Sequence, residues 1–284
     1  MTGQHLPLPL PLPHPLPQRE GAGERGQPHT AKPLADLIAL VTGASRGIGA
    51  AVAIELARLG ARPILVARTQ GGLEETDDAI RAAGGEATLL PLDLLDGAQV
   101  EAIGPSLLQR FGRLDILVHA AAALGRLTPV SHIQPNDWAD VVGVNLTAGW
   151  HLIRTCDPLL RAAEAGRAVI VTDGLVRDAR AYWGAYGATK AALEHLVLTW
   201  AAETRTTRLR INLFEPGPVA TRLRAQAMPG EEPRNLPKPD YIAPAIVALC
   251  FPIEARHGAI VGADAWLRPG IGSTTPGDAF RTAG

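Results

Sequence analysis

The chain has little cysteine, little net charge and no long apolar run, and each absence excludes a class of protein. Cys156 and Cys250 are its only cysteines, with neither a metal-ligand spacing nor a disulfide framework. The 27 Lys and Arg residues nearly balance 28 Asp and Glu residues, giving a net charge of −1. Nothing therefore indicates a surface for nucleic acid or anionic membranes. No apolar run reaches the ~18 residues of a membrane helix. We expect a reduced, cytoplasmic protein without a metal site or a membrane span.

What the chain does have is an ordinary globular composition after an unusual N-terminus. Hydrophobic residues make up 46% of its 284 residues and charged residues 19%, which suits one large α/β domain. Residues 6–17 read LPLPLPLPHPLP, which favours polyproline II and lacks the regions of a signal peptide. We predict a disordered tail over residues 1–36, with a start assigned too far upstream or a ligand for an SH3-like groove as alternatives.

Beyond this tail, short apolar runs alternate with longer stretches of helical periodicity, which predicts successive βαβ units. The expected strands are 37–41, 63–67, 87–92, 114–120, 168–172, 208–214 and 259–267. The expected helices include 50–60, 70–83, 97–111, 135–163 and 183–204. The pattern predicts a doubly wound Rossmann fold, an α/β class with about seven parallel strands flanked by helices on both faces. We expect a single dinucleotide-binding and catalytic domain over residues 37–270 and a C-terminal tail over 271–284.

The first motif that carries chemistry is TGASRGIG at residues 42–49, between a predicted strand and a predicted helix. Glycines allow a ligand to approach the backbone closely, and a helix N-terminus offers free N–H groups to a pyrophosphate. In this position the motif indicates a dinucleotide site rather than a plain structural turn.

Several motifs in order resemble the short, single-domain branch of the short-chain dehydrogenase/reductase family, including its 3-oxoacyl-ACP-reductase-like members. They are TGASRGIG, Asp93-Leu94, Asn145 within VNL, Tyr186-x-x-x-Lys190 and PGPVAT at 216–221. The resemblance covers about residues 36–270 and implies a dinucleotide-dependent oxidoreductase that forms homodimers or homotetramers through the helices at 135–163 and 183–204.

The choice of cofactor can be argued from charge at the end of the second strand. An acidic residue there would accept the ribose hydroxyls and repel a 2′-phosphate, but this chain has Ala67 followed by Arg68. Arg46 in the glycine loop adds a second guanidinium, which can bind phosphate bidentately. We therefore expect NADP(H) rather than NAD(H). By resemblance, the cofactor-binding residues are Gly43, Ser45, Arg46, Gly47, Ile48, Gly49, Arg68, Asp93, Leu94, Tyr186, Lys190, Pro216, Gly217, Val219 and Thr221.

The resemblance also implies the catalytic group. Tyr186 would exchange a proton with the substrate oxygen, and Lys190 would lower the pKa of that phenol and bind the nicotinamide ribose. Asn145 would hold a helix bend and a water that connects Lys190 to bulk solvent. Residues 219–228 would form a mobile lid over the substrate.

Asp173 departs from the family pattern. It stands thirteen residues before Tyr186, where the family has a Ser or Thr that donates to the substrate carbonyl. An ionised carboxylate accepts only, and beside a tyrosinate it costs roughly 4 kcal/mol at ~4 Å. A protonated Asp173 could donate instead, whereas strand alternation turns the neighbouring Thr172 to the opposite face.

A second departure is His119, which opens HAAA where the family commonly has Asn-Asn-Ala-Gly. We interpret His119 as a structural histidine rather than a catalytic base. For the substrate pocket we expect Leu124, Leu175, Tyr182 and Trp183 with the segment 219–235, although Trp183 could instead pack in a subunit interface.

Two functions remain open from the sequence. The first is an NADP(H)-dependent oxidoreductase that interconverts a carbonyl and a secondary alcohol, or acts on a related C=O or C=N group, with catalytic residues Asn145, Asp173, Tyr186 and Lys190. The second is a cofactor-binding protein with weak or no turnover, serving as a sensor or an assembly partner. Asp173 is the feature that separates them.

Overall fold

The structure is a computed structural model that describes residues 32–264. Seven strands form one parallel sheet in the order β3-β2-β1-β4-β5-β6-β7. The strands are β1 (Ile38–Thr42), β2 (Arg62–Ala67), β3 (Thr88–Pro91), β4 (Ile116–His119), β5 (Arg167–Val171), β6 (Arg210–Glu215) and β7 (Ala259–Gly262). This is the doubly wound Rossmann-type fold that the sequence predicts, and the order reverses between β1 and β4, where such folds bind ligands.

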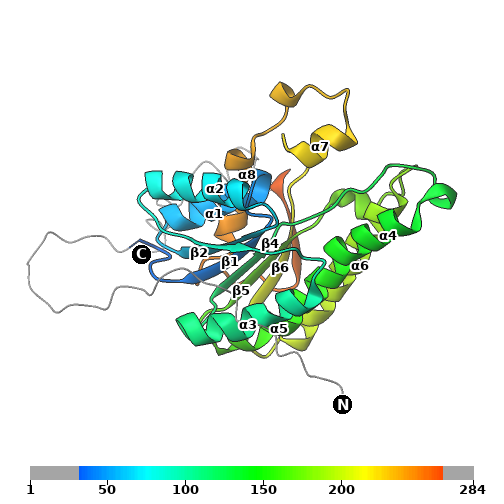
Figure 1. The fold of residues 1–284 in the computed structure, drawn as a ribbon. Helices are drawn as coiled ribbons and strands as arrows, with labels where there is room; N and C mark the ends of the chain where they lie inside the picture. Colours follow the sequence, from blue (N-terminus) through cyan, green and yellow to red (C-terminus); the bar gives the residue numbers. More distant parts are fainter. Residues whose placement is uncertain (1–31, 265–284) are drawn as a thin grey trace, which may run out of the picture.

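The helices cover both faces of this sheet (Figure 1). They are α1 (Gly47–Arg58), α2 (Gln70–Ala82), α3 (Gly97–Phe111), α4 (Pro135–Val142), α5 (Ala148–Ala162), α6 (Gly184–Glu203), α7 (Arg222–Ala227) and α8 (Pro239–Ala248). Helices α1, α2 and α8 pack on one face, and α3, α5 and α6 pack on the other. Each face is sealed by its own apolar core, because strands buried on both sides need cover on both sides.

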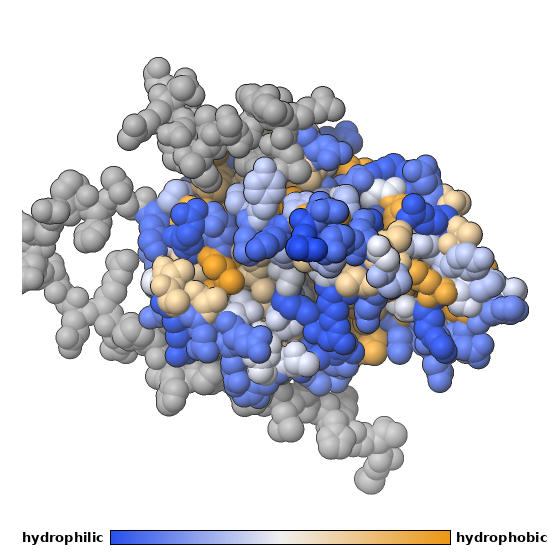
Figure 2. Space-filling view, turned by 90° about the horizontal axis from the view of Figure 1, so that it is seen from above, coloured by the Kyte–Doolittle hydropathy of each residue, from blue (hydrophilic) through white to orange (hydrophobic). Residues whose placement is uncertain are grey.

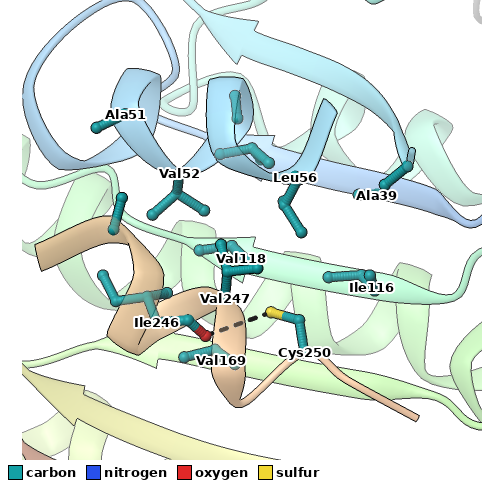
Figure 3. Packing of buried hydrophobic residues seen from close by; sticks show 14 of the residues in the cluster. Ala39, Ala51, Val52, Leu56, Ile116, Val118, Val169, Ile246, Val247 and Cys250 are labelled. Carbon is teal, nitrogen blue, oxygen red and sulfur yellow. Dashed lines mark hydrogen bonds between the residues drawn. The ribbon is translucent and has the colours of Figure 1, made fainter. Parts of the chain in front are cut away.

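Figure 3 shows the core on the α1 face at close range. Val52 of α1 and Val247 of α8 meet the sheet at Val118 of β4. Cys250 lies beside them and donates its thiol to the Ile246 carbonyl at 3.6 Å. Burial raises the pKa of this thiol to about 12, so it behaves as a small apolar side chain rather than as a nucleophile.

The long helix expected over residues 135–163 is divided in the structure. A π-helical turn, Gly143–Thr147, joins α4 to α5. Such turns are rare and concentrate at functional sites. The apolar periodicity of the sequence continues through this turn, so the sequence predicts one helix. The structure instead changes its backbone hydrogen bonding from α to π at Gly143–Thr147.

Other differences lie at the ends of the domain. Helix α8 was not among the expected elements, although it packs closely on α1. Leu34, which the sequence assigns to the tail, is fully buried and donates its N–H to the Leu59 carbonyl at 3.0 Å. The last strand ends at Gly262 rather than 267. Residues 1–31 of the tail expected over 1–36, and the tail expected over 271–284, lie outside the described residues.

The surface of the described domain is mixed. Figure 2 shows a face on which hydrophilic residues predominate and hydrophobic residues form separate small groups. Within residues 32–264, every helix is too short or too polar to span a bilayer.

Candidate active site

The predicted site residues meet at the carboxyl edge of the sheet. The glycine loop follows the end of β1, and Asp173 lies two residues beyond the end of β5. The register of the sheet places Thr42 of β1 beside His119 of β4, which brings these loops together. Helix α6 then carries Tyr186 and Lys190 one turn apart across the end of β5.

Asp173 and Tyr186 are in direct contact. The Tyr186 hydroxyl donates to Asp173 Oδ2 at 3.1 Å, and the Leu175 N–H donates to Asp173 Oδ1 at 3.0 Å. The second bond caps the short turn Gly174–Val176 and fixes the carboxylate. The structure therefore places Asp173 at the position predicted from the thirteen-residue spacing, against the phenol.

The electrostatics of Tyr186 differ from the expectation that Lys190 lowers its pKa. Burial, and then the charge of Asp173 and the hydrogen bond to it, raise the pKa of Tyr186 well above its ordinary value. Burial lowers the pKa of Lys190 to about 8, with Asp173 opposing that change. Without ligands, the phenol is held firmly in its protonated form.

Lys190 is almost completely buried and donates from Nζ to the Val171 carbonyl at 2.9 Å. This bond ties α6 to the last residue of β5 and so holds the ammonium beneath the site. An ammonium in this position can stabilise negative charge on a neighbouring ligand or phenol.

Asn145 lies within the π-helical turn and is fully buried. Its Oδ1 accepts from the Ala123 N–H at 2.7 Å, and its Nδ2 donates to the Ala123 carbonyl at 2.9 Å and to Thr189 Oγ1 at 3.1 Å. Asn145 thus joins the helix bend to the loop after β4 and to the residue before Lys190. Sequence reasoning assigned the bend to Asn145 but missed Thr189, which has no motif of its own.

The glycine loop has the shape of a cradle for a ligand. Gly43 has φ +69°, and a Cβ there would lie 2.9 Å from the backbone of Ala121. A Cβ on Gly49 would lie 2.3 Å from the Gly43 carbonyl oxygen. Gly47 has φ +58°. Side chains at these positions would strain the loop or displace its neighbours, so the glycines let helix and loop close together.

The first turn of α1 is open to an anion. It contains no acidic residue, and no side chain caps it. Arg46 immediately precedes it, and Arg68 follows β2, the strand paired with β1. Both arginines are exposed, and neither has an ion-pair partner within residues 32–264. A helix N-terminus with two unpaired guanidiniums on adjoining segments fits the pyrophosphate and 2′-phosphate of NADP(H).

The remaining predicted cofactor residues lie along the same edge. Thr221 caps α7 by accepting from the Arg224 N–H at 3.1 Å, and its methyl group approaches Gly47. Gly217 has φ +65° after β6. Asp93 accepts from the Leu95 N–H at 3.1 Å. The roles of these residues, and those of Ser45, Ile48, Leu94, Pro216 and Val219, stay predictions.

An apolar cluster surrounds the Tyr186 ring. Its buried members are Leu124, Trp183, Tyr186 and Ala227, with Leu127, Leu175, Leu223 and Met228 packed against them. The Trp183 and Tyr186 rings meet edge to face, with centroids 5.7 Å apart. Tyr182, expected in the pocket, is instead 58% exposed at φ +75°. Leu127 was not among the expected residues, since nothing in its local sequence marks it.

An ion-pair network holds the loop after Asp173. Arg177 contacts Glu194 of α6 at 3.4 Å and Glu215 at the end of β6. Thr172 donates to Glu194 at 3.1 Å, so its hydroxyl is turned away from Tyr186. The partners of Arg177 are 17 and 38 residues distant, which no local pattern could reveal.

His119 lies beneath the site in a neutral form. Its Nδ1 is 2.7 Å from Thr42 Oγ1, and its Nε2 has no hydrogen-bond partner within the described chain. Burial and the nearby Lys190 charge lower its pKa to about 3. A buried neutral imidazole fits a structural role. No group of three or more His, Cys, Asp or Glu residues between 32 and 264 is arranged to hold a metal ion.

Comparison with known proteins agrees with this geometry. Residues 37–232 match the family described as short chain dehydrogenase. The chain is 36% identical over 242 residues to a protein of Escherichia coli K12 named uncharacterized oxidoreductase YciK, covering 84% of this chain and 96% of that protein. It is 33% identical over 200 residues to a Mycobacterium tuberculosis protein named as an NAD-dependent oxidoreductase, covering 65% and 72%.

A solved structure of a related protein supports the same family assignment. The short chain dehydrogenase of Shigella flexneri 2a complexed with NADP is 34% identical and superposes with a TM-score of 0.79, covering 83% of this chain and all of that one. The chain belongs to the short-chain dehydrogenase/reductase family and is an NAD(P)-dependent oxidoreductase.

Proposed function

We propose that this protein is an NADP(H)-dependent reductase that interconverts a carbonyl and a secondary alcohol, with Tyr186 as the acid/base group. The observation that carries the proposal is the place of Tyr186, which lies in the apolar cluster at the carboxyl edge of the sheet, one helical turn before the buried Lys190. A substrate oxygen that reaches this hydroxyl lies above the glycine loop, where a dinucleotide would bind.

The chain's own residues supply binding, orientation and the proton. The dinucleotide, when bound, supplies or takes up the hydride. Arg46 and Arg68 would bind its phosphates, and the glycine loop would hold its pyrophosphate at the N-terminus of α1. In the direction of reduction, Tyr186 donates its proton to the substrate oxygen, and Lys190 stabilises the resulting phenolate.

Asp173 is the residue that limits this reaction. In its ionised form it cannot donate to the substrate oxygen, and removing one such donor costs about 3 kcal/mol in comparable sites. A protonated Asp173 would restore a donor at that place. The same residue supports a second candidate function, a cofactor-binding protein with weak turnover, because it raises the pKa of Tyr186.

A panel of carbonyl substrates on the wild type and on Asp173→Ser separates these two functions. The proposal expects NADPH-dependent turnover in the wild type and an increase of about 10²-fold in kcat in the serine variant. Unchanged or lower activity in that variant would show that Asp173 itself works in catalysis. NADPH binding without turnover in either protein would support the second candidate.

A further inference from the structure

Asp173 is better suited to a positive atom of the substrate than to a developing oxyanion. Its Oδ2 lies 3.1 Å from the Tyr186 hydroxyl, so a substrate atom that reaches Tyr186 also reaches the carboxylate. An ionised carboxylate accepts hydrogen bonds and repels negative charge. Reduction of a C=O group builds negative charge at this point, whereas a protonated C=N group arrives with an N–H donor and a positive charge.

The charges around Asp173 leave it available for such a partner. No Lys, Arg or His of residues 32–264 lies in ion-pair contact with it. Arg177 is held by Glu194 and Glu215. Asp173 is therefore a partly buried carboxylate whose charged neighbours are bound elsewhere.

The charge of Asp173 acts on two further cations, Arg224 and Lys190. Arg224 is near enough for Asp173 to raise its pKa, yet its guanidinium pairs with Glu231 at 2.5 Å. Lys190 is directed to the Val171 carbonyl. The Arg180 guanidinium lies over the Trp183 ring, 5.9 Å from its centroid. A partly buried carboxylate without a paired cation carries a desolvation cost that a cationic ligand can offset.

The protonation of Tyr186 also favours a protonated C=N substrate over a carbonyl substrate. Its hydroxyl already donates to Asp173, and burial with the adjacent carboxylate raises its pKa. Carbonyl reduction requires this phenol to lose its proton beside a negative charge. A protonated C=N group needs no proton during hydride transfer, because its nitrogen already carries one.

We propose that this site reduces protonated C=N groups to amines, with Asp173 binding the cationic nitrogen through the carboxylate that contacts Tyr186. The proposal rests on the proposed function, since it uses the same dinucleotide site and pocket. The C=N carbon accepts a hydride from NADPH, and the C=N π pair becomes the nitrogen lone pair. The substrate is reduced and NADPH is oxidised to NADP⁺. The neutral amine then takes a proton from solvent, and the ammonium stays paired with Asp173.

The residues packed around Tyr186 favour a substrate with an apolar frame around that nitrogen. Leu124, Trp183 and Ala227 are buried in the same apolar cluster as the Tyr186 ring. A cyclic imine fused to an aromatic ring combines one positive atom with apolar surface. Dihydroisoquinoline is such a compound, and tetralone is a bicyclic ketone of similar size without the basic nitrogen.

The test compares NADPH oxidation with these two compounds in the wild type, Asp173→Asn and Asp173→Ser. We expect the wild type to favour the imine in kcat/KM. The neutral Asp173→Asn should lower imine reduction by about 10²-fold, since it removes a charge interaction at the reacting atom. Asp173→Ser should reverse the preference toward the ketone. Asp178→Asn removes an exposed carboxylate from the same loop and should leave the ratio unchanged.

Each outcome decides the proposal. An imine-to-ketone ratio that is the same in wild type and Asp173→Asn would overturn it while leaving the carbonyl function intact. If neither compound is turned over, binding of tetrahydroisoquinolinium and of tetralol to the NADP⁺ complex decides. Tighter binding of the ammonium, lost in Asp173→Asn, supports the proposal. Equal binding of the two overturns it, and absent turnover of any carbonyl separately counts against the proposed function.

Discussion

At the scale of single residues, the behaviour of the site follows from three neighbours. Asp173 accepts from the Tyr186 hydroxyl, and Lys190 lies buried beneath them. The carboxylate and the burial keep the proton on the phenol, whereas burial alone favours the neutral form of the lysine. Which of these three side chains carries a proton therefore depends on the ligand that binds beside Asp173.

Lys190 should make the stability of the ligand-free protein depend on pH. Its pKa is about 8 in the folded protein against an ordinary value of 10.5, so between these pH values the unfolded chain binds more protons. The free energy of unfolding should therefore rise with pH across this window, by on the order of 3 kcal/mol, because each pKa unit is worth about 1.4 kcal/mol. Chemical denaturation of wild type and Lys190→Met from pH 7 to 10 measures this.

The difference between the two proteins is the informative quantity. The buried thiols Cys156 and Cys250, whose pKa is raised to about 12, act in the opposite direction, but they are common to both proteins and cancel. The wild type should gain stability relative to Lys190→Met as pH rises through 8. Parallel pH profiles would mean that Lys190 is not perturbed as described.

Sequence spacing predicted the identity of these residues better than their chemistry. The Tyr186 and Lys190 pair and the position of Asp173 follow from helix spacing and family resemblance. The direction of the Tyr186 pKa does not, because it depends on how deeply the ring is packed by residues from distant segments. The same holds for the contact of Arg177 with Glu215, which forms only once β6 lies beside β5.

At the scale of elements, the strands were predictable and one helix was not. Fully buried parallel strands such as β1 and β5 are continuous apolar runs, which stand out in a sequence. Helix α8 is also apolar, so its hydrophobic periodicity is weak. It carries Pro244 in its interior, and an interior proline argues against a helix. Its place against α1 is a matter of packing that local sequence does not encode.

The unit formed by β1, α1 and β2 should determine the choice of cofactor. Arg46 precedes α1 and Arg68 follows β2, both without ion-pair partners within residues 32–264. At 100 times its Kd, NADPH should raise Tm by about 5 to 10 °C, since such saturation adds ~2.7 kcal/mol of stability. NADH at the same concentration should give a smaller shift, which differential scanning fluorimetry can measure.

Variants assign this preference to the two arginines. The double variant Arg46→Ala, Arg68→Ala should lose about 10²- to 10⁴-fold in NADPH affinity, because each phosphate contact to a charged donor contributes ~1.5–3 kcal/mol. The rise in Tm that NADH produces should be nearly the same in this variant as in the wild type. Arg62→Ala is the matched control, since Arg62 lies at the other end of β2 and pairs with Asp36. A larger shift with NADH in the wild type would refute the preference.

At the scale of the whole molecule, the fold leaves one edge for chemistry. Both faces of the sheet are closed by helices and apolar cores (Figure 1). The predicted dinucleotide and substrate residues gather at the carboxyl edge. Trp138 of α4 and Trp150 of α5 are 46% and 43% exposed, on helices that the resemblance implies in oligomer contacts. Assembly into dimers or tetramers stays a prediction.

If hydride transfer takes place at this edge, with Tyr186 and Asp173 at the reacting atom, a labelled hydride must reach the substrate there. The label is followed with NADPH deuterated on the nicotinamide ring and mass spectrometry of the reduced ketone and imine. We expect one deuterium on the former C=O or C=N carbon in the wild type. We also expect Tyr186→Phe to slow label transfer to the ketone by about 10²–10⁴-fold. Absence of label from both products, or equal rates of transfer to the ketone in wild type and Tyr186→Phe, would contradict these expectations.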